Sequence, residues 1–275
     1  MTPLRQTLRN NRLLYFLYGC LLRLKFEIQA SIATFLWKRS SRHTASKLAI
    51  PPPRLRHRVH GCLDYRSFER AGSENFISLV PTLDQLQEKQ ERPLKVLDFG
   101  CGCARTLVHF LTLRPHWHYT GTDIDSQAIE WNSKHLTGKA VWYVNECSGP
   151  LPFRDEEFDA ILAVSLFTHL DENLQDFWLQ EFKRILKTTG IVLATVHGKT
   201  VWEKNPKWTE DVEKSGLLYL RTNVGIRNLA QTPDHYQTTL HSKSYIVGNW
   251  SRIFTNIQYE ENAINNWQDL VVLSH

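Results

Sequence analysis

From Leu94 onward, short apolar runs alternate with segments of helical periodicity, and this alternation restricts the possible folds most. Strand-like runs are expected at 95–99, 117–122, 140–144, 158–164, 190–196, 253–259 and 269–273, with helices at 104–113, 126–136 and 171–186. Such a pattern predicts an α/β fold with a doubly wound, mostly parallel, seven-stranded sheet and helices on both faces. Ligands of such sheets bind at the carboxyl ends of the strands.

Residues 1–93, before this alternation, show helical periodicity and a proline-rich break. Helical periodicity runs over 4–38, Pro51, Pro52 and Pro53 end any helix there, and 65–91 looks helical again. The expected division is a basic amphipathic helical arm (1–50), a linker with leading helices (51–93) and the main domain (94–275).

Charge is distributed unevenly along the chain. Residues 1–66 hold 13 Lys/Arg against 2 Asp/Glu, a net of +11, and the remainder holds 20 against 26, a net of −6. The apolar run from Leu13 to Leu22 is too short to span a bilayer, which takes about 20 residues, and charges follow it where a signal peptide needs a cleavage site. Three readings stay open for the arm: packing on the domain, resting on an anionic membrane surface, or self-association.

Five cysteines at irregular spacing fit neither a disulfide framework nor a zinc ligand set. We therefore expect no metal, and a cytoplasmic, membrane-peripheral protein in a reducing compartment. The sequence does not specify an oligomeric state.

A glycine loop follows the first strand of the alternation. Gly100 and Gly102 permit a tight turn and a close approach to a ligand, and Arg105 stands where a dinucleotide fingerprint needs a third glycine. Asp98 before the loop suits an ammonium group better than a pyrophosphate. Asp123 closes the next strand, where a carboxylate can accept both hydroxyls of a ribose, while Asp125 is the better helix cap.

These segments resemble the ordered motifs of class I S-adenosylmethionine-dependent methyltransferases. The similarity lies in Val-Leu-Asp-Phe-Gly-Cys-Gly at 96–102, Gly-Thr-Asp-Ile-Asp at 121–125, the segment at 151–159 and the turn at 184–190. The resemblance implies S-adenosylmethionine as the cofactor. It implies that Gly100 and Gly102 line the methionine part and that Asp98 orients its amino group.

The same resemblance implies the other cofactor contacts. Asp123 would hold the ribose, Ile124 would pack on the adenine and Asn145 would make a polar adenine contact; Ser165, after the fourth strand, is also counted as a cofactor residue. Two departures stand out. Ala104 replaces a common third glycine, a mild change if the residue is already helical, and Thr188-Thr189 replace Pro-Gly in a surface turn.

The acceptor side is the loop at 165–170, which lacks the Asn/Asp-Pro-Pro-Tyr/Phe motif of enzymes that methylate base nitrogens. It resembles loops of small-molecule and glycan methyltransferases. His169 sits where similar O-methyltransferases have a histidine, as a general base for a hydroxyl or as an acceptor contact, and the alternative is a structural histidine near a helix start. His197 is a second catalytic candidate. His235, Tyr236 and His241 are candidates for a cap of the pocket. Trp202, Trp208 and Trp250 are candidates for its walls, but aromatic residues are more often part of the core.

The predicted function is therefore methyl transfer to a hydroxyl or amine of a small molecule or glycan. One alternative is a protein that binds the cofactor without catalysis. Another is an RNA methyltransferase steered by the basic arm, but the arm's basic residues are mixed with Leu, Phe and Ile, which argues against nucleic acid.

Overall fold

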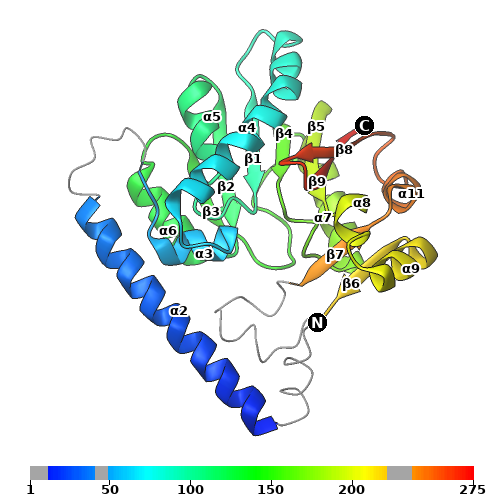
Figure 1. Ribbon diagram of the computed structural model, residues 1–275. Helices are drawn as coiled ribbons and strands as arrows, with labels where there is room; N and C mark the ends of the chain where they lie inside the picture. Colours follow the sequence, from blue (N-terminus) through cyan, green and yellow to red (C-terminus); the bar gives the residue numbers. More distant parts are fainter. Residues whose placement is uncertain (1–11, 41–48, 222–236) are drawn as a thin grey trace.

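The computed structural model describes residues 12–40, 49–221 and 237–275 of the chain (Figure 1). One sheet contains seven strands in the order β3-β2-β1-β4-β5-β9-β8. Their bounds are β1 Lys95–Phe99, β2 His118–Asp123, β3 Val141–Val144, β4 Phe158–Ala163, β5 Leu186–Val196, β8 Asn256–Ile264 and β9 Gln268–Ser274. The first five strands in this order pair in parallel. Strand β9 lies between β5 and β8 and runs antiparallel to both. The predicted fold class is confirmed.

Helices cover both faces of the sheet because alternate strand residues point to opposite sides. Val96 packs with α4 (Tyr65–Glu88), α5 (Leu107–Leu113) and α6 (Ser126–His135). Its neighbour Leu97 packs on the other face with α7 (Glu172–Ile185). The division of the chain at residue 94 remains a prediction, but α4 and β1 share one core.

Aspartates fix the starts of three helices. Asp64, Asp125 and Asp171 accept backbone N–H groups in the first turns of α4, α6 and α7. The expected cap at Asp125 and the expected helix start beside Asp171 are thereby confirmed. The expected start of a helix at Ala104 is wrong: Ala104 has a φ of +59°, and α5 begins at Leu107.

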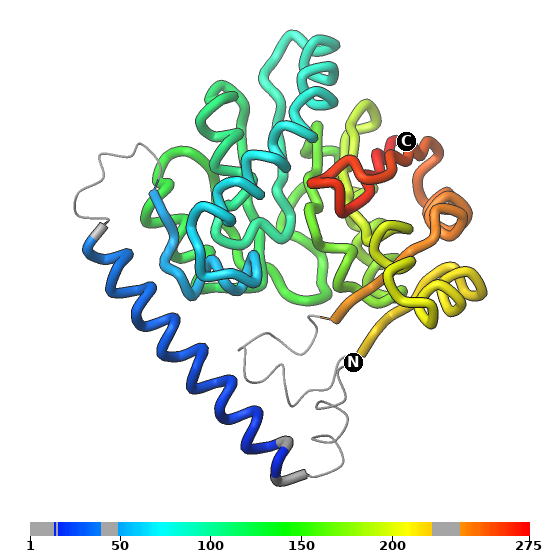
Figure 2. The backbone as a smooth tube through the Cα atoms, viewed as in Figure 1, coloured from blue at the N-terminus to red at the C-terminus, as the bar shows by residue number. Residues whose placement is uncertain are grey.

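A lobe between β5 and β8 lies beyond what the sequence predicted. It contains α8 (Lys199–Trp202), α9 (Pro206–Ser215), α11 (Lys243–Tyr245), the π-helical turn Ile246–Trp250 and an antiparallel pair, β6 (Leu217–Leu220) with β7 (Thr238–His241). Figure 2 shows this lobe in yellow to orange, on the side of the molecule away from α6. Its own small core is formed by Val201, Trp202, Val212 and Leu240.

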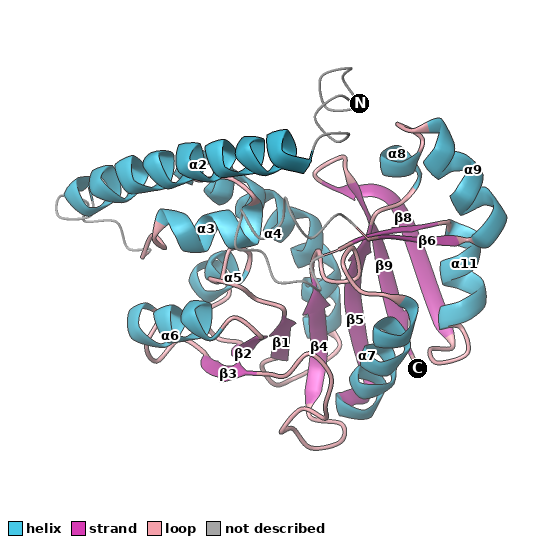
Figure 3. Cartoon of the chain, turned by 90° about the horizontal axis from the view of Figure 1, so that it is seen from below, coloured by secondary structure: helices cyan, strands magenta, loops and turns pink. Residues whose placement is uncertain are grey.

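The helical arm is α2 (Arg12–Ser40), which lies against α3 (Pro53–His60) on the outside of the molecule (Figure 3). An ion pair joins Glu27 to Arg54 at 2.5 Å, and the rings of Phe26 and His57 lie 4.5 Å apart between centroids. Within the described ranges, no helix combines the length and the apolar character that a bilayer crossing requires.

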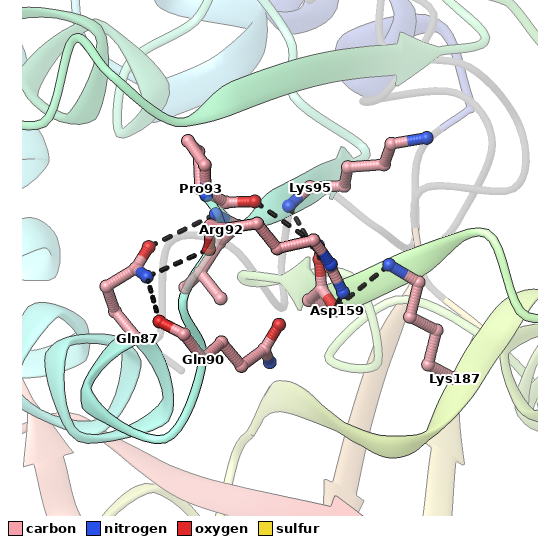
Figure 4. A network of polar contacts seen from close by, with 8 residues as sticks. Gln87, Gln90, Arg92, Pro93, Lys95, Asp159 and Lys187 are labelled. Atoms are coloured by element: carbon pink, nitrogen blue, oxygen red, sulfur yellow. Dashed lines mark hydrogen bonds and ion pairs between the residues drawn. The ribbon is translucent and has the colours of Figure 1, made fainter.

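A buried carboxylate ties the amino ends of β1, β4 and β5 together (Figure 4). Asp159, whose side chain is fully buried, accepts two hydrogen bonds from Arg92 at 2.6 and 2.7 Å. It also accepts from the Lys95 amide at 2.8 Å and from the Lys187 ammonium at 3.0 Å. Every interaction of Asp159 therefore favours its ionised form, at the end of the sheet opposite the glycine loop.

Asp159→Asn should lower the free energy of unfolding by about 3 kcal/mol, because it removes the charge that compensates Arg92 and Lys187. Urea unfolding would measure the loss. The matched surface change Asp84→Asn, at a half-exposed pair with Arg114, should cost less than about 1 kcal/mol. Equal losses would show that burial of Asp159 has no energetic consequence.

Acid should erase this difference. Burial raises the pKa of Asp159, but the bonds from Arg92, the Lys95 amide and Lys187 outweigh it and hold the pKa below its ordinary value of 3.8. A lowered folded-state pKa means that the stabilisation is complete above the ordinary value and is lost as the pH falls through the folded one. Parent and Asp159→Asn stabilities should therefore converge below about pH 3.8.

Candidate functional site

A cavity opens at the carboxyl ends of β1, β2 and β4, where a ligand is expected in this class of sheet. It encloses about 930 Å³ of empty space, its open mouth included. Eight of the residues selected from the sequence line it, namely Asp98, Gly100, Gly102, Asp123, Ile124, Asn145, Ser165 and His169. The structure therefore brings together residues that are up to 71 positions apart in the sequence.

The glycine loop forms the floor of the cavity in a conformation that requires glycine. Gly100 and Gly102 have φ angles of +77° and +52°. The amides of Gly100 and Cys101 both donate to the Thr122 carbonyl, at 2.8 and 2.9 Å, which holds the loop against β2. A Cβ at Gly102 would lie 2.5 Å from Cγ2 of Val59, a residue of α3 that also lines the cavity.

Ala104, which replaces a common third glycine, is not part of the helix that follows, so the replacement is not mild. Its φ of +59° is left-handed, a conformation that costs a residue with a Cβ roughly 1–2 kcal/mol. Ala104 nevertheless packs in the core between the sheet and α4. Tertiary packing therefore holds this strained backbone in place.

Asp98 is a buried carboxylate in a surrounding that disfavours its charge. Burial, followed by the charge of Asp123, raises the pKa of Asp98 to about 7, and Arg105 acts in the opposite direction. A ligand with a positive group here would restore the ionised form. The ammonium and sulfonium of S-adenosylmethionine fit this requirement, and a pyrophosphate does not.

Asp123 is already engaged with the backbone around it. One carboxylate oxygen accepts the Gly102 amide at 2.7 Å and the other accepts the Asp125 amide at 2.8 Å. Burial raises its pKa, and these two amides lower it. A carboxylate oxygen has two lone pairs, so each oxygen can still accept a ribose hydroxyl.

Asn145 presents a polar atom that the protein leaves unsatisfied. Its Nδ2 donates to the Glu146 carbonyl at 2.8 Å, while its buried Oδ1 has no hydrogen-bond partner among the described residues. An unpaired buried acceptor beside a cavity fits a ligand donor such as the adenine amino group. Together with Asp98, this atom shows that the residues present fit the cofactor that the resemblance implies.

Sequence reasoning missed several residues that line the cavity, among them Val59, Arg105, Glu146 and Trp178. Arg105 served only to exclude a dinucleotide fingerprint. In the structure it lies in the lining, its Nη1 contacts His60 Nδ1 at 3.0 Å, and its charge lowers the pKa of Asp98. Its position directly after the glycine loop could have suggested a partner for the cofactor's carboxylate.

His169 follows β4 on the loop at the mouth of the cavity, and a backbone contact orients its ring. Nδ1 lies 2.6 Å from the Gln237 carbonyl oxygen. A carbonyl can only accept, so Nδ1 must carry the proton, and in the neutral ring Nε2 then carries the lone pair. Ser165, at the start of the same loop, donates from its hydroxyl to Gln268 Oε1 at 3.1 Å.

The second catalytic candidate lies apart from the cavity lining. His197 sits at the end of β5, bridged to Leu240, and its buried Nδ1 has no partner among the described residues. Burial, with the charge of His169, lowers its pKa to about 4. His197 therefore stays neutral near pH 7.

The other cap and wall candidates also lie elsewhere. His241 is fully buried, with Nε2 at 3.0 Å from Gln175 Oε1, and burial lowers its pKa to about 3. Trp202 and Trp208 belong to the core of the lobe, and Trp250 to the core beneath α7. His235 and Tyr236 fall outside the described residues. Across the part of the chain that the structure describes, no three His, Cys, Asp or Glu side chains gather as metal ligands.

Comparisons with known proteins agree with this geometry. Residues 96–190 match a family model described as a methyltransferase domain. A fatty-acid O-methyltransferase from Mycolicibacterium smegmatis is 33% identical over 102 residues, which are 37% of this chain and 36% of that protein. The chain thus spans less than half the length of the curated relatives it matches.

Two solved structures share the fold. Human N-acetylserotonin methyltransferase, in complex with S-adenosylmethionine, has a TM-score of 0.53 at 15% identity, with 80% of this chain and 55% of that chain covered. A putative O-methyltransferase from Nostoc punctiforme has a TM-score of 0.51 at 15% identity, with coverage of 77% and 61%. At these identities the likeness concerns the fold alone.

Proposed function

The chain belongs to the class I S-adenosylmethionine-dependent methyltransferases, and on that premise we propose that it methylates a hydroxyl or amine of a small molecule or glycan. Its cofactor is S-adenosylmethionine. The observation that carries the proposal is the position of His169, with its tautomer fixed, in the lining of the cavity that holds Asp98 and Asp123.

Bound S-adenosylmethionine supplies an electrophilic methyl group on a positively charged sulfur. The protein's residues then have positioning roles. Asp98 holds the amino group, Asp123 the ribose and Arg105 the carboxylate of the methionine part. Gly100 and Gly102 leave room for the ligand, while Ile124 and Asn145 contact the adenine.

The remaining contacts concern the acceptor. Nε2 of His169 takes the proton of an acceptor hydroxyl as the oxygen gains its methyl group, and the Gln237 carbonyl holds the imidazole in the productive tautomer. Ser165 shapes the end of the cavity nearest this loop. The partial relative that is described as a fatty-acid O-methyltransferase supports an oxygen acceptor.

Turnover with unidentified acceptors tests the proposal. The protein is incubated with S-adenosylmethionine and with fractionated metabolite, glycan and lipid extracts, and mass spectrometry records products heavier by one methyl unit. The Gly100→Val variant, which should not bind cofactor, is the blank. Cofactor binding without any methylated product across these fractions would refute the enzymatic role and leave a binding protein.

Asp123→Ala should weaken S-adenosylmethionine binding about tenfold to a hundredfold, because a charged hydrogen bond is worth about 1.5–3 kcal/mol. Isothermal calorimetry would measure the change. Glu130→Ala removes an exposed carboxylate of α6 that does not line the cavity, so it is the matched control.

Asp123 also holds the Gly102 and Asp125 amides, and a ligand analogue separates the two roles. A cofactor analogue without the two ribose hydroxyls should bind the parent and Asp123→Ala with similar affinity. If the substitution weakens both ligands equally, Asp123 supports the loop and does not contact the ribose.

A further inference from the structure

The arm helix α2 presents a long apolar face that the described part of the protein does not cover. Seven apolar side chains on this face are 47–65% accessible: Leu17, Leu21, Leu24, Ile28, Ile32, Phe35 and Leu36. Leu17, Leu21, Leu24 and Ile28 follow one another at intervals of four, three and four, which places them on one side of a helix with 3.6 residues per turn. An uncovered apolar face of this extent marks an interaction surface.

The opposite side of α2 is the one that faces the domain. Ala30 is fully buried there, Phe26 packs on His57, and Trp37 donates from its indole to the Ile50 carbonyl at 3.0 Å. Phe26, Ala30 and Trp37 are half a helical turn away from Leu21 and Ile28. The contact with α3 therefore holds α2 in place with its apolar face directed away from the protein.

The charge on α2 indicates what can cover this face. The helix has five basic residues and one acidic residue, Glu27, which is already paired with Arg54. Lys25, Lys38 and Arg39 are exposed, while Arg23, seven positions before Ala30, lies on the side of α2 toward the domain. Two copies of α2 side by side would bring like charges together with no acidic partners between them. An anionic lipid surface accepts both the apolar side chains and the basic ones.

We infer that α2 is a membrane-surface helix that docks the protein on anionic bilayers, with the Leu17–Leu36 face in the acyl boundary and the basic side chains among the headgroups. This inference does not depend on methyl transfer, because it rests on the exposure and charge of α2 alone.

Co-sedimentation with vesicles of defined composition tests the inference on the full chain. Vesicles of equal parts phosphatidylglycerol and phosphatidylcholine should bind the protein, and pure phosphatidylcholine should bind it at least tenfold less strongly. Raised salt should weaken the binding further, since screening removes the attraction to the headgroups. Equal partition onto both vesicle types would overturn the proposed partner.

Paired substitutions locate the surface. Leu21→Glu with Leu24→Glu should reduce binding to anionic vesicles about tenfold or more, because both side chains lose their place in the acyl boundary. Ile77→Glu with Leu113→Glu places the same charges at equally exposed apolar positions outside α2 and should leave binding unchanged. Unaltered S-adenosylmethionine affinity would verify that each variant is folded.

Two results would contradict the inference. Binding that both pairs of substitutions reduce equally would assign it to net charge and not to α2. The second result is a protein that does not bind vesicles but forms a concentration-dependent dimer in light scattering. If the Leu21 and Leu24 changes abolished that dimer, the apolar face would bind a second copy of the chain.

Discussion

His169→Ala should lower kcat by about 10²–10⁴ for a hydroxyl acceptor, the usual effect of losing a general base. The residue lies in the cavity lining, and its Nδ1 contact with the Gln237 carbonyl leaves Nε2 as the basic nitrogen of the neutral ring. Cofactor affinity should change little, since other residues hold the cofactor. Steady-state kinetics together with calorimetry would measure both quantities.

A second variant separates chemistry from support of the loop. His169→Asn can still donate to the Gln237 carbonyl from its amide but cannot accept a proton. If His169 is the base, Asn should be as inactive as Ala. If His169→Asn recovered turnover, His169 would support the structure of the loop and would not act as the base. His116→Ala, at an exposed histidine outside the cavity lining, is the control.

Gly100→Val should abolish detectable S-adenosylmethionine binding, a loss of at least about a hundredfold, because the side chain would enter the space of the ligand. Even without ligand, a Cβ here would lie 3.3 Å from Leu166 Cδ1. Calorimetry tests binding, and circular dichroism tests whether the variant keeps its fold.

Backbone strain alone could also weaken this variant, and Gly138→Val controls for it. Gly138 has nearly the same φ, +72° against +77°, and nothing lies within 4 Å of its Cβ position. Both variants should lose similar stability, but only Gly100→Val should lose the cofactor. Normal binding by Gly100→Val would mean that the loop is not the site.

The sequence predicted the sheet because most of its strands are short apolar runs, such as Phe158–Ala163, that alternate with helical segments. It predicted the cavity lining for a related reason: residues such as Asp98 and Asp123 end strands that run in parallel, so the topology brings them together. The start of α5 was not predictable, since the left-handed backbone at Ala104 is imposed by packing and no glycine marks it.

The lobe between β5 and β8 was missed for a different reason. Leu217–Leu220 and Thr238–His241 are four-residue strands whose pairing is long-range, and neither has an alternating pattern. Trp202, Trp208 and Trp250 lie in cores, the more common place for an aromatic residue, and not in the walls of the pocket. Trp178, which does line the cavity, has the spacing of an ordinary helix core residue of α7.

Val59 gives the leading helices a part in cofactor affinity. It belongs to α3, lines the cavity and closes over Gly102, yet α3 precedes the segment that matches the methyltransferase family model. The position of α3 therefore helps to set the space that a ligand meets above Gly102. If a displacement of α3 changed cofactor affinity by some factor, a bound cofactor would bias the position of α3 by the same factor, as reciprocity requires. Because α2 packs on α3, binding at the surface of α2 could be coupled to cofactor binding through α3.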